Sequence, residues 1–438
     1  MMASGSALRV VESCLVTPSE ETPRGGLWLS ALDLALTKRG HTPVVLVYSA
    51  SATADDDFFN VAKLKESLAK ALVPFYPLAG RLSANSEDGR IEVNCNGEGA
   101  HFRVAYSDDH TAEGLITDPA PSMELVKLFK PRVEQTILLA VQVTFLRCGG
   151  VVLGISMHHA AGDGSSMGHI IRTWASYCRD GEGAVIELPC HDRALLRARS
   201  PPVIHPETMP MLSSGLTMHT ELVAASKVFT ISSEQLHALK RHCGGTSTFC
   251  TLSALVWKCV CVAHGLAPDA TTRINFPVDI RRRLRPPLPA GYFGNGVINV
   301  FATAATKDVV YGMLSSVASR VKAASERLNS DEVLRSAIDY LEMAGPEDIG
   351  NLPETVVRVN SWFQLRMYEA DFGWGKPRVT LRAGAVRGGW VYLLPETGGH
   401  GGGGVELLVY LEAPILSKFD RAVTETVCGV QATERARL

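Results

Sequence analysis

The sequence predicts an α/β fold, with two domains that each contain a mixed sheet covered by helices. Its 438 residues exceed the usual size of one domain, which favours two domains of comparable size. In both halves, short segments rich in valine and leucine alternate with longer segments whose apolar residues recur at helical spacing. This alternation stops between residues 183 and 218, where prolines are frequent. We therefore expect a first domain at 1–182, a crossover loop at 183–218 and a second domain at 219–438.

The first domain is expected to combine strands with two helices. A helix is predicted over 58–72, where apolar residues share one face, and the Pro-Leu-Ala-Gly sequence at 77–80 ends it. A second helix is predicted over 167–178, directly after a glycine-containing turn. The predicted strands are 8–16, 43–48, 90–95, 101–105, 136–146 and 151–157. The crossover loop contains arginines that we expect to face solvent, namely Arg193, Arg197 and Arg199.

The second domain is expected to be similar in kind. Ser232 and Gln235 have the spacing of a capping box, which predicts a helix that continues to Cys243. The other predicted helices are 249–266, 310–328, 331–343 and 414–427. The predicted strands are 227–231, 272–278, 296–302, 379–383, 389–394 and 405–411.

Composition excludes several classes of protein. A net charge of −2 gives no electrostatic basis for binding nucleic acid or an anionic membrane. The 10 cysteines are scattered without a C-x-x-C pair, which predicts reduced thiols in a cytoplasmic protein and no metal site. No apolar run approaches the roughly 18 residues that span a bilayer. The glycine-rich segment 398–404 lacks the Lys-Ser/Thr and helix of a phosphate-binding loop.

Two short motifs suggest the chemistry. His158-His159-Ala-Ala-Gly-Asp163-Gly follows the apolar run 151–157, which predicts a sharp turn that presents one imidazole while the carboxylate folds back. Far downstream comes Asp371-Phe-Gly-Trp374-Gly. A neutral imidazole with a pKa near 6.5 can accept the proton of an attacking hydroxyl or amine at pH 7. No G-x-S-x-G nucleophile motif is present, so we expect direct attack on a bound thioester.

In this order, the two motifs resemble the paired signature of the plant acyl-CoA-dependent acyltransferases of the BAHD type. Further similar segments extend over most of the chain: Tyr76–Leu82, Ser247–Phe249, Tyr292–Asn295 and Leu334–Glu342. The resemblance implies two similar, chloramphenicol-acetyltransferase-like domains with an active-site tunnel between them. It also implies a monomer that needs no cofactor other than the coenzyme A thioester, its donor substrate.

The resemblance also assigns residue roles. His159 would be the general base, and its neighbour His158 would be structural. Asp163 would pair with an arginine and shape the loop, and Asp371 would form a structural ion pair with Arg281 or Arg283. Trp374 would lie near the tunnel, where its indole N–H could donate to an oxyanion or carbonyl. Ser247 and Thr248 would lie on the coenzyme A side.

The N-terminal sequence resembles the hydroxycinnamoyl-CoA branch, whose members acylate shikimate, quinate, glycerol or amines. Shikimate-using members carry an arginine where this chain has Glu347, beside Asp348. Two acidic side chains would repel an anionic acceptor and hold the distal ammonium of a polyamine such as putrescine, agmatine or spermidine. The other predicted substrate-binding residues are Val44, Leu46, Asn360 and Trp362.

Three alternatives remain at this point. The acceptor could be a hydroxyl of shikimate, quinate or glycerol, with Arg358 anchoring a carboxylate. More distant alternatives are a metal hydrolase that uses His158, His159 and Asp163, and a catalytically silent relative that binds acyl-CoA.

Overall fold

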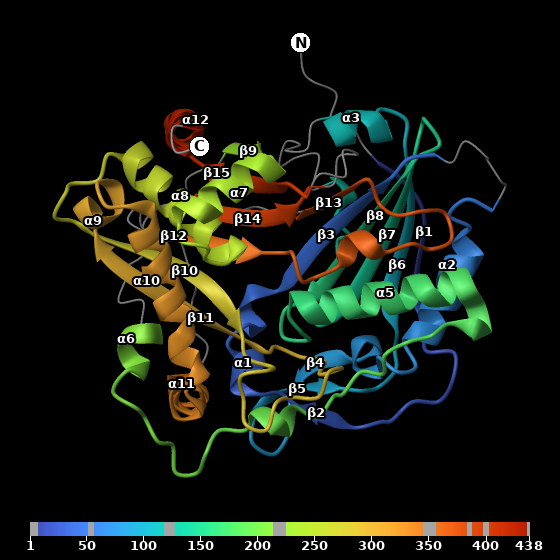
Figure 1. The fold of residues 1–438 in the computed structure, drawn as a ribbon. Helices are drawn as coiled ribbons and strands as arrows, with labels where there is room; N and C mark the ends of the chain where they lie inside the picture. The colour runs from blue at the N-terminus through green and yellow to red at the C-terminus, as the bar shows by residue number, and fades with distance from the viewer. Residues whose placement is uncertain are drawn as a thin grey trace. The chain divides into compact units, whose positions relative to one another are not determined.

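The computed structural model describes residues 8–50, 57–117, 128–212, 225–344, 356–382, 388–396 and 403–435 (Figure 1). The chain forms two compact units, and each consists of three segments. Unit 1 comprises Met1–Arg197, Leu288–Gly296 and Leu365–Ala385. Unit 2 comprises Ala198–Pro287, Val297–Gln364 and Val386–Leu438.

This division differs from the expected boundaries in one respect that matters for the site. The motif Asp371–Gly375 was expected in the C-terminal domain but belongs to unit 1, because segment Leu365–Ala385 returns to it. Within that segment, β13 (Val379–Arg382) pairs antiparallel with β3 (His41–Tyr48). The sequence does not reveal this pairing because more than 300 residues separate the partners.

Unit 1 is built on a six-stranded mixed sheet of order β1-β6-β7-β8-β3-β13. Only β6 and β7 run parallel, and the other neighbours are antiparallel. The remaining strands of this sheet are β1 (Arg9–Val16), β6 (Ala100–Ser107), β7 (Leu139–Leu146) and β8 (Val151–His158). Every residue of β8 is buried, in keeping with its continuous apolar sequence. A small second sheet contains β2 (Gly26–Trp28), β5 (Ile91–Asn94) and β4 (Arg81–Ala84).

Helices α5 (Gly164–Asp180) and α2 (Val61–Ala71) pack against each other in unit 1 (Figure 1). Trp174 of α5 is buried and donates its indole N–H to the carbonyl oxygen of Leu64, 3.0 Å away. Gly168 allows a close approach, because a Cβ at this position would lie 2.1 Å from the carbonyl oxygen of Leu365. Among the residues that the structure describes, unit 1 also contains helices α1 (Ala31–Leu34) and α3 (Ala112–Thr117).

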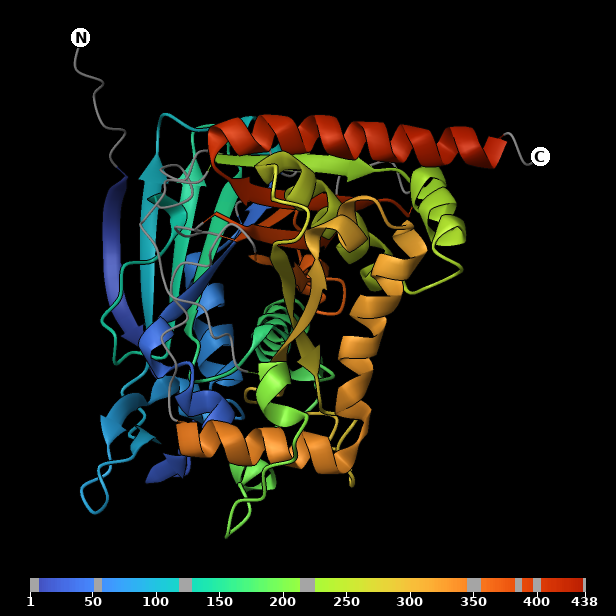
Figure 2. The same ribbon diagram turned by 90° about the vertical axis from the view of Figure 1, so that its left-hand side faces the viewer.

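Unit 2 contains a second six-stranded mixed sheet, of order β11-β10-β12-β14-β15-β9. Its strands are β9 (Ala225–Ile231), β10 (Thr271–Asp279), β11 (Val297–Ala305), β12 (Val356–Ser361), β14 (Trp390–Pro395) and β15 (Val405–Leu411). Its helices are α6 (Thr208–Leu212), α7 (Ser233–His242), α8 (Thr248–His264), α9 (Thr306–Val310), α10 (Leu314–Glu326), α11 (Asp331–Ala344) and α12 (Ala413–Arg435). Helix α8 is largely buried and contacts α10 and α12, and α12 runs beside β9 and β15 (Figure 2).

These elements confirm the predicted α/β class with mixed sheets and flanking helices. The predicted capping box is present, since Ser232 and Gln235 hydrogen-bond each other's backbone N–H groups. The helix predicted over 310–328 was wrong in outline, because it is divided into α9 and α10 at Tyr311–Met313. Strand β12 was missed.

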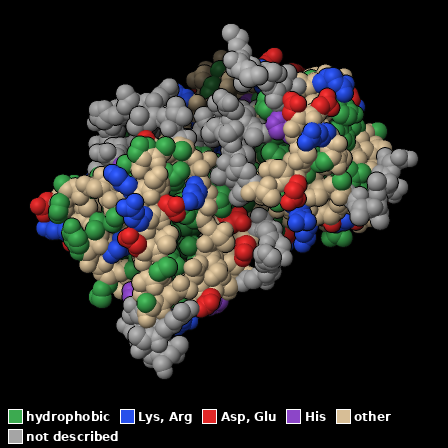
Figure 3. All heavy atoms as spheres, turned by 90° about the horizontal axis from the view of Figure 1, so that it is seen from above, with side chains coloured by type: hydrophobic (Ala, Val, Ile, Leu, Met, Phe, Trp, Pro, Cys, Tyr) green, Lys and Arg blue, Asp and Glu red, His purple; other side chains and the backbone are tan. Residues whose placement is uncertain are grey.

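The surface agrees with the balanced charge. Acidic and basic side chains are interspersed on the face drawn in Figure 3. Among the helices that the structure describes, none is both long and apolar enough to cross a membrane. All ten cysteines are free thiols. Within the described ranges, no three histidine, cysteine, aspartate or glutamate side chains gather in a way that could hold a metal ion.

Candidate active site

The predicted histidine turn joins the end of β8 to the start of α5. The backbone N–H of His159 donates to the carbonyl oxygen of Gly40, 2.8 Å away, and that of His158 donates to Leu138 at the same distance. Ala161 closes the turn by donating to the carbonyl oxygen of His158 at 2.9 Å. Three hydrogen bonds therefore fix the turn backbone before any substrate binds.

Asp163 terminates the turn as the N-cap of α5. Its Oδ1 accepts from the backbone N–H of Ser166 at 3.1 Å, and its Oδ2 accepts from Gly296 at 2.9 Å. An N-cap carboxylate satisfies free N–H groups and favours the positive end of the helix dipole. The carboxylate thus folds back and shapes the loop as predicted. The arginine partner expected for it stays a prediction.

The His159 side chain is suited to accept a proton. The residue keeps partial solvent exposure, whereas its Nδ1 is buried and has no hydrogen-bond partner among the described residues. Nε2 is therefore the ring nitrogen left to meet a substrate. Burial lowers the pKa of His159 well below its usual value, and the positive charges of Arg39 and Arg382 act in the same direction. The imidazole is consequently neutral at pH 7, as a general base must be.

His158 has a different environment. It is only 1% exposed, and its ring packs edge-on against His41, with 5.1 Å between ring centroids. Its Nδ1 accepts from the backbone N–H of Ala160 at 3.2 Å. Burial lowers the pKa of His158 to about 4. These contacts support the structural role predicted for it.

The pKa of His158 predicts how stability depends on pH. Below pH 6.5 the unfolded chain binds a proton at this histidine, whereas the folded protein does so only near pH 4. The free energy of unfolding should therefore fall as the pH drops from 6.5 to 4, and His158 alone should account for about 2 kcal/mol by pH 5. Denaturant unfolding at pH 7 and pH 5 measures this loss. His158→Gln should reduce it, and an equal loss in the variant would contradict the assignment.

Behind the turn lies an ion pair that sequence reasoning missed. Arg193 was expected to face solvent, but it is 2% exposed, and its Nη1 lies 2.8 Å from Oδ1 of Asp33. Its Nη2 donates to the carbonyl oxygen of Ala161 at 2.8 Å. The expectation was wrong because a buried carboxylate and a turn carbonyl compensate the burial of the guanidinium. Neither partner is near it in the sequence.

The second motif forms a compact loop in unit 1. Oδ1 of Asp371 accepts from the backbone N–H groups of Gly373 at 2.9 Å and Gly375 at 3.0 Å. Both glycines have positive φ, 103° and 93°, which explains why these positions carry no side chain. Phe372 is fully buried against Trp174, with 4.8 Å between ring centroids. Asp371 thus holds the loop together.

The arginines proposed as partners of Asp371 belong to unit 2. There Arg281 pairs with Asp279 at 3.4 Å, and Arg283 donates to the carbonyl and hydroxyl oxygens of Ser325. An ion pair with Asp371 would join the two units, so it stays a prediction.

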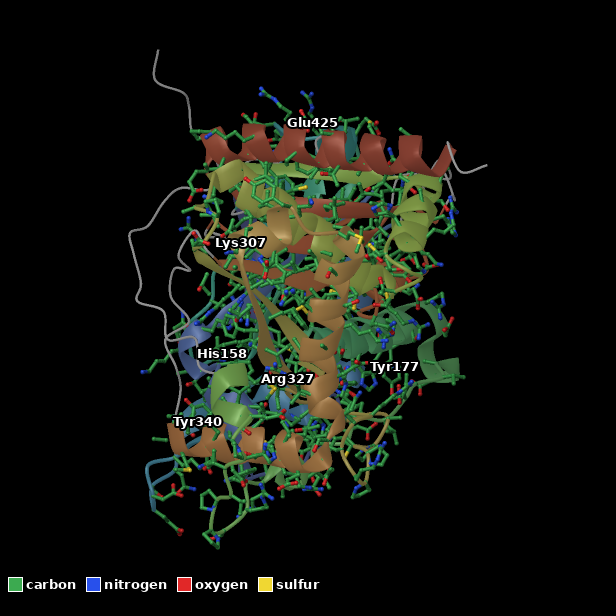
Figure 4. The ribbon with its side chains drawn as sticks, turned by 60° about the vertical axis from the view of Figure 1, so that its left-hand side comes forward. His158, Tyr177, Lys307, Arg327, Tyr340 and Glu425 are labelled. Carbon is green, nitrogen blue, oxygen red and sulfur yellow. The ribbon has the colours of Figure 1, made fainter. Side chains whose placement is uncertain are left out.

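Trp374 lies far from His159 within unit 1, and its place near the tunnel stays a prediction. Its ring packs against Phe59, with 4.9 Å between centroids, and Nζ of Lys63 lies 5.2 Å from its centroid. The same loop meets the far end of α5, where Arg179 donates to the carbonyl oxygen of Asp371 at 3.1 Å. His159 precedes the other end of this 17-residue helix, which is roughly 25 Å long. Figure 4 shows the two ends by His158 and Tyr177, on opposite sides of the view.

The other predicted substrate residues fall into three groups. Val44 and Leu46 are 1% and 0% exposed on β3, so both belong to the core of unit 1. Asn360 lies on β12 opposite Tyr392, and the ring of Trp362 packs against that tyrosine with 5.6 Å between centroids. Glu347 and Asp348 lie outside the described residues.

On the proposed coenzyme A side, Ser247 is the N-cap of α8 and accepts from the backbone N–H of Cys250 at 3.2 Å. Thr248 is the first residue of that helix. Arg358, the alternative anchor for an acceptor carboxylate, is 4% exposed and lies over the ring of Trp390 at 4.6 Å.

Comparison with known proteins decides the family. The model of the Transferase family matches residues 7–426. The chain belongs to this family. It is an acyl-CoA-dependent acyltransferase of the BAHD type, which confirms the resemblance drawn from the two motifs. Membership also rejects the metal hydrolase.

Two curated relatives align with nearly the whole chain. Putrescine hydroxycinnamoyltransferase 1 of Oryza sativa subsp. japonica is 40% identical over 94% of this chain and 98% of its own length. Shikimate O-hydroxycinnamoyltransferase of Nicotiana tabacum is 36% identical over 92% of this chain and 97% of its own. The crystal structure of vinorine synthase has the same fold, with a TM-score of 0.76 at 24% identity over 94% of this chain and 96% of that one.

Proposed function

We propose that this acyltransferase moves a hydroxycinnamoyl group from its coenzyme A thioester to a primary amine, with His159 as the general base. The polyamines putrescine, agmatine and spermidine are the proposed acceptors. The observation that carries the proposal is the neutral imidazole of His159, whose Nδ1 is buried and whose Nε2 is left to meet a substrate. The relative named for putrescine supports an amine acceptor.

The reaction needs one proton transfer at each stage. The acceptor nitrogen attacks the thioester carbonyl while Nε2 of His159 takes the proton that the nitrogen loses. The tetrahedral intermediate then collapses, the carbon–sulfur bond breaks, and the imidazolium returns its proton to the coenzyme A sulfur. No acyl-enzyme forms, and no cofactor takes part. A free amine has a pKa near 10.4, so the reacting nitrogen must lose its ammonium proton before attack.

The tunnel expected between two domains stays a prediction, as do the roles of Asn360 and Trp362 beside the acceptor. The relatives named for putrescine and for shikimate have similar sequence identity to this chain. The preference for an amine over a hydroxyl acceptor therefore rests on the proposed role of the acidic side chains of Glu347 and Asp348.

Incubation with p-coumaroyl-CoA and an equimolar mixture of acceptors tests the proposal. The mixture contains shikimate, quinate, glycerol, putrescine, agmatine and spermidine, and mass spectrometry identifies the products. We expect amides of the polyamines that disappear with His159→Ala. Esters of shikimate or quinate would retain acyl transfer but contradict the amine acceptor, and absence of coenzyme A release with every acceptor would indicate a silent relative.

The double variant Glu347→Gln/Asp348→Asn tests the acidic segment separately. Loss of a charge-assisted contact worth about 1.4 kcal/mol would raise the KM for a polyamine roughly tenfold. The KM for p-coumaroyl-CoA serves as the internal control and should not change. An unchanged polyamine KM would contradict the proposed role of these two residues.

A further inference from the structure

A cluster of three buried polar side chains lies directly behind the histidine turn. We call Asp33, Arg193 and Asn295 the support cluster. Their exposed fractions are 0%, 2% and 0%, and more than 100 residues separate each from the next along the chain of unit 1. The pattern of apolar residues in the sequence does not predict a buried ion pair here. Burying two charges is costly unless hydrogen bonds and ionic contacts compensate the loss of water.

The Asp33 carboxylate has an unusually full set of donors. Its Oδ1 accepts from the backbone N–H and Nδ2 of Asn295, at 3.0 Å and 2.8 Å, and forms an ion pair with Nη1 of Arg193 at 2.8 Å. Its Oδ2 accepts from the backbone N–H and the hydroxyl of Ser30, at 3.0 Å and 2.7 Å. Four hydrogen bonds and one ion pair compensate the buried charge, and they hold Asp33 in one position.

The cluster contacts the turn at two carbonyl oxygens. Nδ2 of Asn295 donates to the carbonyl oxygen of His159 at 2.8 Å, and Nη2 of Arg193 donates to that of Ala161 at 2.8 Å. The orientation of the Asn295 amide is determined, because a reversed amide would place its oxygen against two acceptors. Asn295 therefore bridges the buried carboxylate and the backbone of His159.

We propose that Asn295 is a positioning residue for His159, and that Asp33 and Arg193 hold it in place. The inference rests on the proposed function of His159 as general base. With the N–H of His159 bound to Gly40 and its carbonyl bound to Asn295, the peptide groups on both sides of its Cα are fixed. The imidazole then has only its side-chain torsions to adjust, which favours a geometry close to that needed for proton transfer.

A double-mutant cycle tests the proposal. Asn295→Ala should lower kcat about 10- to 100-fold, since small displacements of a catalytic group are costly, and should leave both KM values unchanged. In a His159→Ala background, Asn295→Ala should lower the residual enzyme-dependent rate no further, because residues that act as a unit are not additive. If Asn295→Ala does not fold, Asn295→Ser is measured in the same way, because its hydroxyl can still donate to one of the two acceptors.

Asn275 offers a matched control in unit 2. It is also 0% exposed, and its Nδ2 donates to a backbone carbonyl, that of Val300, at 3.2 Å. Asn275→Ala should lower stability without lowering kcat of the folded protein. The proposal is overturned if Asn295→Ala lowers the rate equally in both backgrounds, or leaves kcat unchanged while His159→Ala abolishes activity. Full activity of His159→Ala would instead show that His159 is not the general base. The proposed function would then fail, and Asn295 would have no catalytic group to position.

Discussion

Replacing His159 with alanine is expected to lower kcat about 10²- to 10⁴-fold, the usual contribution of a positioned general base. The reason lies in the turn between β8 and α5, where the ring is neutral and its Nδ1 is buried. An alanine at this position keeps the backbone hydrogen bond to Gly40, so the fold should persist. The measurement is the steady-state rate of coenzyme A release with the acceptor that proves active.

His158→Gln is the matched control, since the two histidines are adjacent and only one is proposed to react. It should lower stability, because His158 is buried against His41, yet retain kcat in the folded protein. The low pKa of His159 adds a second readout: the acid limb of kcat/KM should lie below pH 6.5. A limb near 6.5, or a large loss of kcat in His158→Gln alone, would count against the assignment.

Removing one partner of the buried ion pair is expected to destabilise the protein by about 3–5 kcal/mol. Arg193→Met leaves the Asp33 carboxylate buried without its counter-charge, and Asp33→Asn does the same to the guanidinium. The double variant should cost less than the sum of the two single variants, because it leaves no uncompensated charge.

Denaturant unfolding of the two single variants and the double variant measures these differences. Lys307→Met provides a surface control, since Lys307 pairs with Asp269 at 2.9 Å while 55% and 87% of their side chains are exposed. Its cost should stay below about 1 kcal/mol. If Arg193→Met and Lys307→Met lowered the free energy of unfolding equally, burial would not determine how much the Arg193–Asp33 pair contributes to stability.

The sequence predicted those parts of the site that depend on local contacts. The turn and the folding back of the Asp163 carboxylate both follow from residues within eight positions of one another. The support cluster could not be predicted in this way, because Asp33, Arg193 and Asn295 are far apart in the chain. Arg193 even lies in a proline-rich segment that is typical of exposed loops.

The same distinction applies to the position of Trp374. The resemblance located its motif correctly in the sequence, but its position in space depends on pairing between β13 and β3 and on the contact with Arg179. Helical and strand periodicity report which face of an element is buried, not which distant element covers it. The fold class could therefore be predicted from the sequence, whereas the return of segment Leu365–Ala385 to unit 1 could not.

The pairing of β13 with β3 also has a consequence during synthesis. Until residues Val379–Arg382 leave the ribosome, the outer edge of β3 has no partner strand, although its sequence His-Thr-Pro-Val-Val-Leu-Val-Tyr is strongly apolar. At about 5–20 residues per second, the ribosome needs roughly 10–40 s to pass from Arg197 to Ala385. An open apolar edge that persists for this time invites aggregation. The nascent chain therefore carries this unpaired apolar edge until almost nine-tenths of it has been made.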